Sequence, residues 1–407
     1  MNKKILIGFL GFFLSFYSIS EELLLKNLKI HTATDKGTLE ISDLLIRDGL
    51  ILRIGKNLSS SRAQVLDLAG KVVTPGFISP HSQLGIVEIE LIPETRDDRS
   101  ELYSAGLNID SAFNPSSTLI PYNLTGGITL SLTVPSSSGL FSGLTSAFSL
   151  SGSLENSLIA SNIALTADIS GGEDSKAAKI LLLEDSLDMA SKISRKLPDF
   201  ELWKSTFPKN VDYSARDIRA LKKVMLKEIP LIVKANRASD ILSLIELSKR
   251  RNFNLVIQGA AEGWRVAKHL ANANVAVILQ PIDNLPHSFN ELGARLDNAS
   301  LLHEAGVKIL ISSHETHNAY LSRQGAGTAV AYGLPWQEAL KGLSKNIADV
   351  FKLDKRGSIK EGYIADLVIW SGDPLEVTSF VEAVYLSGKA VPVKNRSMKL
   401  KDRYLNN

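Results

Sequence analysis

The first part of the chain alternates apolar and polar residues with a period of two. The segments LLLKNLKIHTA, LEISDLLIRDGLILRIG and AQVLDLAGKVVTPG have this pattern, and turn residues separate them at Asp35-Lys36-Gly37 and Asp48-Gly49. Successive side chains of a strand point to opposite faces, so this alternation is typical of strands with one solvated face. The pattern predicts that residues 21–75 form part of a small β-domain.

The middle of the chain has a different pattern. Its strand-like segments are almost entirely apolar, which is typical of parallel strands covered on both faces: GITLSLTVP, PLIVKAN, NLVIQGA, VAVILQP and VKILISS. Segments with helical periodicity lie between several of them, as at 239–252 and 262–274. Repeated alternation of strand and helix predicts an α/β fold in which residues 76–355 form a (β/α)8 TIM barrel.

The period-two pattern returns at the end of the chain, in GSIKEGYIADLVIW and FVEAVYLSGKAV. We therefore expect residues 356–400 to complete the same small domain, as a β-sandwich built from both chain ends. One stretch rich in serine and glycine, PSSSGLFSGLTSAFSLSGS, follows a predicted barrel strand. It is interpreted either as a long loop or as a wall over the barrel mouth, and the sequence leaves both open.

The N-terminal residues have the features of a secretory signal. Lys3 and Lys4 precede an apolar run over residues 5–17, and Ser18-Ile19-Ser20 follows. This run is shorter than the roughly 20 residues that span a bilayer, which favours a cleaved signal peptide over residues 1–20 against a transmembrane anchor. We expect a periplasmic or secreted protein with no stable membrane anchor after cleavage.

Composition narrows the chemistry. The 407 residues are 44% hydrophobic and carry a formal net charge of +3, which gives no indication of a nucleic-acid partner. The absence of cysteine excludes disulfides, thiolate metal sites and a cysteine nucleophile. No G-x-S-x-G, Walker A or G-x-G-x-x-G motif occurs. A small-molecule substrate is the expected partner, and homo-oligomerisation stays open.

Three segments carry a family resemblance: KVVTPGFISPHSQLG, GVKILISSHETHNAYLSRQGAGTAVAYGLPWQEAL and GSIKEGYIADLVIWSGDPLE. Together they resemble the amidohydrolase superfamily, closest to its imidazolonepropionase-like branch. The resemblance implies a hydrolase in which one or two divalent metals, usually zinc, activate water. It implies a His-x-His pair after the first barrel strand, histidines at strands five and six, sometimes a carboxylated lysine, and a proton-accepting Asp at strand eight.

The chain departs from this pattern at each of these strands, although one imidazole of the first-strand pair is retained. The first-strand pair becomes His81 and Gln83, and Gln258 stands at the sixth-strand position. These three are the candidate ligands of an atypical divalent metal site, with zinc as the expected ion. At the fifth strand stands Lys234, a candidate catalytic residue. Once carboxylated it would be a metal ligand, whereas an unmodified ammonium would supply positive charge in place of the ion, and both interpretations stay open.

The remaining candidates follow barrel strands. His314 stands near the position of the family's Asp, and a shift of one residue in the alignment would place Glu315 there, so these two are the candidate proton acceptors. Candidate substrate-binding residues are Asn236, Arg237, His317 and Asn318. Arg237 could hold a substrate carboxylate, or it could form a salt bridge with Asp240.

Two hypotheses result. The first is an exported hydrolase that cleaves a carbon–nitrogen bond of a non-peptide or cyclic amide with an atypical metal site. The alternative is a non-catalytic, ligand-binding barrel that has lost the metal.

Overall fold

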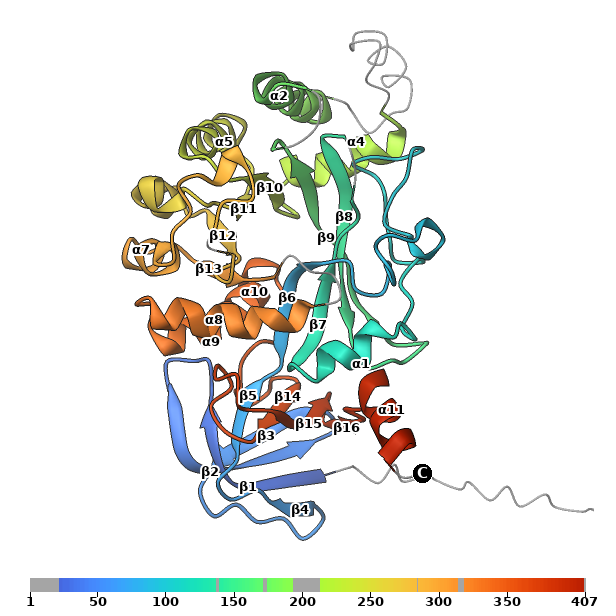
Figure 1. Cartoon of the computed structure of the whole chain (residues 1–407), viewed down its shortest axis with the longest axis vertical. Coiled ribbons are helices and arrows are strands. Elements are labelled where there is room, and N and C mark those ends of the chain that lie inside the picture. The colour runs from blue at the N-terminus through green and yellow to red at the C-terminus, as the bar shows by residue number, and fades with distance from the viewer. Residues whose placement is uncertain are drawn as a thin grey trace, which may run out of the picture.

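The computed structural model describes residues 22–136, 139–170, 174–192, 213–283, 285–313 and 318–405. Two sheets organise these residues, and Figure 1 shows the smaller sheet domain below the barrel. Within this part of the chain, no helix combines the length and the apolar character needed to cross a membrane.

Sheet A contains strands from both ends of the chain. Its strand order is β16-β15-β14-β5-β1-β2-β3, with β4 paired to β1. The early strands are β1 (Glu22–His31), β2 (Thr38–Arg47), β3 (Leu50–Gly55), β4 (Gln64–Asp67) and β5 (Val72–Pro75). The late strands are β14 (Leu367–Trp370), β15 (Val381–Leu386) and β16 (Lys389–Val391). The antiparallel pairing of β14 with β5 joins the two groups. The sandwich form expected for this domain stays a prediction.

Sheet B forms a nearly closed barrel of eight strands in the order β13-β12-β11-β10-β9-β8-β7-β6. The strands are β6 (Phe77–Ser82), β7 (Ile128–Thr133), β8 (Phe141–Ser149), β9 (Leu158–Asp168), β10 (Leu231–Ala235), β11 (Leu255–Gly259), β12 (Ala276–Leu279) and β13 (Ile309–Ile311). At the seam between β13 and β6, Ser312 Oγ donates to the carbonyl oxygen of His81 at 3.4 Å. The mixed α/β class and the barrel agree with the sequence prediction.

The barrel departs from a regular (β/α)8 arrangement at β8. This strand pairs antiparallel with both β7 and β9, whereas the other neighbours are parallel. Only residues 134–140 and 150–157 connect it to its neighbours, and a parallel crossover needs a dozen residues or more, so the two connections are hairpins. Residues 141–149 of the serine- and glycine-rich stretch, interpreted from the sequence as a loop or a wall, therefore form a barrel strand.

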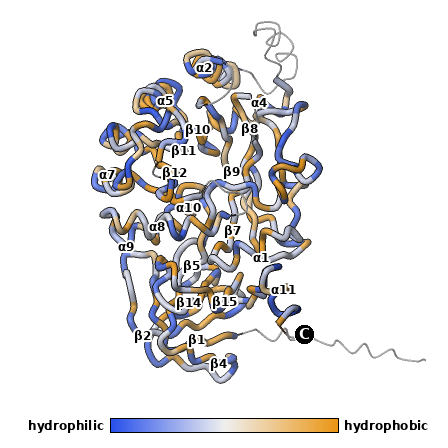
Figure 2. Tube along the Cα trace, in the orientation of Figure 1, coloured by the Kyte–Doolittle hydropathy of each residue, from blue (hydrophilic) through white to orange (hydrophobic). Residues whose placement is uncertain are grey.

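Helices cover the outside of the barrel. They are α1 (Leu119–Leu124), α2 (Lys176–Lys192), α4 (Ala215–Met225), α5 (Ala238–Arg251), α6 (Ala267–Asn272), α7 (Asn298–Glu304), α8 (Ser322–Ala331), α9 (Trp336–Leu343) and α10 (Lys345–Val350). Helix α11 (Arg396–Leu405) lies beside β16 of sheet A (Figure 1). Single 3-10 turns occur at Pro93–Thr95, Gly263–Val266, Phe289–Glu291 and Ala319–Leu321. Figure 2 shows the most apolar residues concentrated on the strands that these helices enclose.

A buried tryptophan joins the two sheets. Trp370 at the end of β14 is fully buried and its indole Nε1 donates to Thr74 Oγ1 at 2.9 Å. Its ring lies 5.4 Å from that of Phe77, the first residue of the barrel. Gly127 has a φ of 86°, and a Cβ atom there would come within 2.6 Å of the indole. Glycine at this position allows β7 to start directly beside the tryptophan.

Candidate functional site

The strand pattern builds a polar layer at one end of the barrel. Ile232, Val256 and Ile278 belong to one buried apolar cluster inside the barrel. Because side chains alternate along a strand, the residue two positions further along each strand also points inward. These residues are Lys234, Gln258 and Gln280, which lie at the carboxyl ends of β10, β11 and β12. A polar layer therefore covers the apolar floor at the end where barrel enzymes carry their active sites.

Asp168 extends this layer onto β9. It pairs in register with Lys234, and Lys234 pairs in register with Gln258. Lys234 Nζ lies 3.6 Å from Asp168 Oδ2, while Asp168 Oδ1 accepts hydrogen bonds from the backbone and hydroxyl of Ser170, both at 2.6 Å. The Lys234 and Asp168 side chains are 38% and 30% exposed, so both can meet a ligand. They form a half-buried ion pair at the barrel mouth.

The ion pair borders a cavity of about 200 Å³. His81, Ser82 and Gln83 at the end of β6 form part of its wall, opposite Asp168, Lys234 and Gln258. The His81 side chain is half-buried. The structure thus brings the candidate residues His81, Gln83, Lys234 and Gln258 to one cavity.

A buried carboxylate fixes the amide of Gln83. Gln83 Nε2 donates to Asp98 Oδ2 at 3.1 Å, and Arg96 donates to both Asp98 oxygens at 3.0 and 2.8 Å. Ser136, another residue of the cavity wall, also donates to Asp98. Burial by itself would raise the pKa of Asp98, but the hydrogen bonds from Arg96 and Ser136 and the charge of Arg96 outweigh it and hold that pKa below its usual value. Gln83 is therefore positioned by an ionised aspartate.

The donor chemistry of this cavity does not fit the predicted zinc site. Within the described residues, no group of three or more His, Asp or Glu side chains is arranged to hold a metal ion. The amide nitrogen of Gln83 is bonded to Asp98, and the ammonium of Lys234 lies 3.6 Å from Asp168 Oδ2. A catalytic zinc ion is normally held by three strong protein ligands, and an ammonium repels a cation. The metal roles of His81, Gln83 and Gln258 stay predictions.

Three candidates, His314, Glu315 and His317, lie outside the described residues. Asn318 lines a different cavity, of about 520 Å³, together with Glu88, Tyr122 and Arg396. The structure therefore does not bring Asn318 to the wall of the cavity that holds Lys234.

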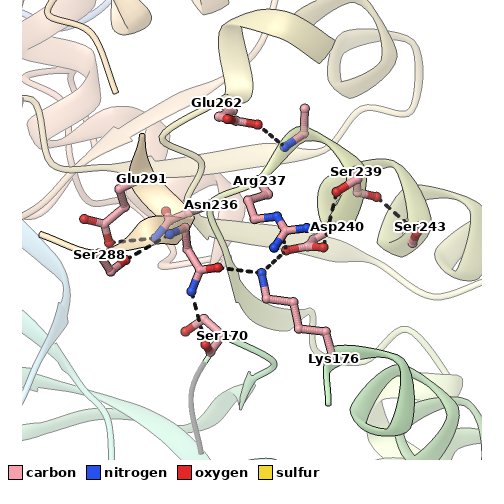
Figure 3. A network of polar contacts seen from close by, with 12 residues as sticks. Ser170, Lys176, Asn236, Arg237, Ser239, Asp240, Ser243, Glu262, Ser288 and Glu291 are labelled. Atoms are coloured by element: carbon pink, nitrogen blue, oxygen red, sulfur yellow. Dashed lines mark hydrogen bonds and ion pairs between the residues drawn. The ribbon is translucent and has the colours of Figure 1, made fainter. Parts of the chain in front are cut away.

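Asn236 and Arg237 belong to a polar network beside the mouth (Figure 3). Asn236 is 6% exposed, and its amide donates to Glu291 Oε1 at 2.9 Å and accepts from the backbone of Ala261 at 3.3 Å. Arg237 Nε lies 4.0 Å from Asp240 Oδ2, which also accepts from Lys176 at 2.5 Å. The salt bridge considered for Arg237 is present, and Asn236 connects β10 to the loop that contains Glu291.

Sequence reasoning missed Asp168, Asp98 and Gln280. Asp168 had a usable signal, because ALTAD ends an apolar run with a polar residue just as LIVKA does. Gln280 had the same signal in VILQP. Asp98 had none, since it stands in the long acidic connection after β6 and its burial depends on Arg96 and Ser136.

Comparisons with known proteins agree with this architecture. Residues 241–393 match the model described as Amidohydrolase family. A D-hydantoinase of Geobacillus stearothermophilus is 41% identical over 102 residues, covering 25% of this chain and 20% of that protein. An amidohydrolase of Hapsidospora irregularis is 22% identical over 395 residues, covering 86% of this chain and 40% of that protein. The chain thus spans less than half the length of either curated relative.

A solved structure is similar over almost its full length. The crystal structure of an amidohydrolase from Thermotoga maritima MSB8 has a TM-score of 0.81 and 25% sequence identity, and the match covers 91% of this chain and 99% of that chain. The imidazolonepropionase-like branch stays a prediction. The family-model match and this structural similarity show that the chain belongs to the amidohydrolase superfamily.

Proposed function

We propose that the protein hydrolyses a carbon–nitrogen bond of a small non-peptide or cyclic amide at the barrel mouth. The observation that carries this proposal is the row Asp168, Lys234 and Gln258, which borders a cavity at the carboxyl ends of neighbouring parallel strands. Family membership supports hydrolysis, and a D-hydantoinase among the relatives supports a carbon–nitrogen bond as the target.

In this proposal Lys234 provides the positive charge of the site. Attack of water on an amide carbonyl places negative charge on the carbonyl oxygen, and a fixed ammonium stabilises that charge. Asp168 Oδ2 lies 3.6 Å from Lys234 Nζ, and this ion pair helps to hold the ammonium in position. The donor set of the described residues does not fit a zinc ion, so no step is assigned to one.

Hydrolysis also needs a group that accepts the proton of the attacking water. His81 lines the cavity, and a neutral imidazole can take that proton and return it to the departing nitrogen as the carbon–nitrogen bond breaks. His314 and Glu315 remain predicted acceptors from the sequence. Substitution of each of the three by Gln, followed through the pH profile of kcat, distinguishes them, because the acceptor's loss removes the acidic limb of that profile.

The decisive experiment compares two lysine variants. Hydrolysis of hydantoin, dihydrouracil and dihydroorotate is followed by liquid chromatography for the wild type, Lys234→Met and Lys268→Met. Lys268 is an exposed lysine on α6 and serves as the matched control. We expect kcat/KM to fall at least about 100-fold in Lys234→Met, in line with loss of an oxyanion-stabilising donor, and to be unchanged in Lys268→Met.

Two results would count against this function. Turnover by Lys234→Met at the wild-type rate would remove the lysine from the chemistry. Binding of these compounds without turnover by the wild type would instead favour the non-catalytic, ligand-binding barrel.

Export is a separate part of the proposal. The basic and apolar character of residues 1–20 supports cleavage near Ser20 and a periplasmic or secreted location. Mass spectrometry of the protein recovered from its native cell tests this, since a retained N-terminus would contradict cleavage.

A further inference from the structure

A second cavity lies beside the first at the barrel mouth. It has a volume of about 60 Å³ and shares Lys234 and Gln258 with the larger cavity. Its outer wall is the connection between β12 and α7, which contributes Leu285, Glu291 and Leu296. The two cavities therefore meet at the lysine and form neighbouring parts of one site.

One buried side chain in this second cavity lacks a hydrogen-bond partner. Gln280 is 9% exposed, and within the described residues its Nε2 has no acceptor. In two other buried amide side chains of the same wall, both the nitrogen and the oxygen form hydrogen bonds. Asn236 bonds Glu291 and Ala261, and Asn298 bonds the carbonyl of Ala260 and the backbone N–H of Trp264. Burial of an unpaired amide costs stability, so Gln280 Nε2 is a donor held ready for a ligand.

A turn and a neighbouring helix fix the backbone around Gln280. The carbonyl oxygen of Gln280 accepts from the backbone N–H of Asp283 at 3.0 Å, closing a turn directly after β12. Helix α8 packs against this turn through Gly325, where a Cβ atom would lie 3.4 Å from the backbone nitrogen of Ile282. The Cα atom of Gln280 is therefore held at a fixed place in the cavity wall.

The surroundings indicate which acceptor suits the donor. Asp283 and Glu291 contribute carboxylates to the cavity wall and disfavour a second anion. The cations of the same wall, Lys234 and Arg295, already pair with Asp168 and Asp297. Leu279, Leu285 and Leu296 contribute apolar surface. A neutral carbonyl oxygen can accept a hydrogen bond from Gln280 and is compatible with this wall. A carboxylate could accept the same hydrogen bond, but the carboxylates of the wall would repel it.

We propose that Gln280 is a specificity-determining residue that donates through Nε2 to a carbonyl oxygen of the substrate other than the carbonyl that water attacks. This inference rests on the proposed function, because it assigns Lys234 to the attacked carbonyl. Lys234 on β10 and Gln280 after β12 stand two strands apart, which separates their backbones by about 10 Å. Two long side chains that converge across this span can hold two carbonyls of one small ring.

The first test measures stability without ligand. The variant Gln280→Leu removes the unpaired donor, and we expect its Tm to equal or exceed that of the wild type, as at binding sites that sacrifice stability for function. Gln64→Leu, at an exposed position of β4, is the matched control. Gln280→Met repeats the measurement with an unbranched side chain. A Tm lowered in both Gln280 variants would assign Gln280 to structure and overturn the proposal.

The second test measures recognition by calorimetric titration. Hydantoin has two ring carbonyls, 2-imidazolidinone has one, and hydantoin-5-acetate adds a carboxylate. We expect the wild type to bind hydantoin about tenfold more tightly than 2-imidazolidinone, and Gln280→Leu to lose this preference. Failure to bind hydantoin, an unchanged preference in the variant, or a Gln280-dependent preference for hydantoin-5-acetate would each overturn the proposal.

These outcomes are separable from those of the proposed function. Selective binding that depends on Gln280 without any turnover would retain the carbonyl subsite and reject the hydrolase. Turnover that depends on Lys234, with an unchanged ligand preference in Gln280→Leu, would retain the hydrolase and reject the carbonyl subsite.

Discussion

Lys234 and Asp168 show how much of the candidate site can be inferred from single residues in the sequence. Lys234 attracts notice in the sequence because a cation ends an apolar barrel strand. Its significance comes from Asp168, which is 66 positions earlier in the chain and reaches it through the register of β9 and β10. This register depends on the complete barrel. The sequence therefore singled out Lys234 as a candidate residue, but it did not indicate that Asp168 is its partner.

His31 gives a prediction at the residue scale. Burial foremost, with the nearby charge of Lys29, lowers its pKa from 6.5 to about 4. Its ring lies 4.3 Å from that of Trp336, and its Nδ1 bonds Thr38 Oγ1 at 2.8 Å. The folded state favours the neutral imidazole, so the associated stability is complete above pH 6.5 and is lost as the pH falls from 6.5 towards 4.

Urea unfolding across that pH range tests this. The free energy of unfolding should decrease less steeply towards acid in His31→Gln than in the wild type. His269→Gln, at an exposed position of α6, should keep the wild-type slope. Equal slopes for the wild type and His31→Gln would show that His31 does not carry the pH dependence.

At the scale of elements, the apolar strands and their turns were predictable, whereas β8 was not. Its sequence FSGLTSAFS contains small polar residues, yet all but the last are buried. Hydroxyl groups remain compatible with this burial when they find partners across the sheet, as Thr145 Oγ1 does with Thr166 Oγ1 at 3.2 Å. Those partners are non-local, so the local pattern predicted a loop or a wall over the barrel mouth and not a strand.

Helix α4 supports a prediction about how the loop after β6 is held. Ser214 and Asp217 form a capping box at its N-terminus. The same buried carboxylate accepts from the backbone N–H of Gly106 at 2.6 Å and of Ser104 at 3.2 Å. Asp217→Ala should lower the free energy of unfolding by about 2 kcal/mol or more, because it removes a cap and leaves buried donors unpaired.

Chemical denaturation measures this loss, with Asp185→Ala on the exposed side of α2 as the control. A change in Asp217→Ala no larger than in the control would mean that the carboxylate does not anchor the loop.

At the scale of the whole molecule, the chain ends meet in sheet A and the barrel between them presents one polar mouth. The overall architecture followed from the sequence, because periodicity and the resemblance both depend on many residues. The metal expectation depended on a few ligand positions, and at the fifth-strand position Lys234 forms an ion pair with Asp168. Our central claim is that the ammonium of Lys234 supplies the positive charge of the site.

The metal content of the purified full-length protein tests that claim most directly. Elemental analysis after gel filtration in metal-free buffer should find less than about a tenth of a divalent ion per chain, and dialysis against a chelator should leave Tm unchanged. Close to one divalent ion per chain, with a fall in Tm on its removal, would contradict the account.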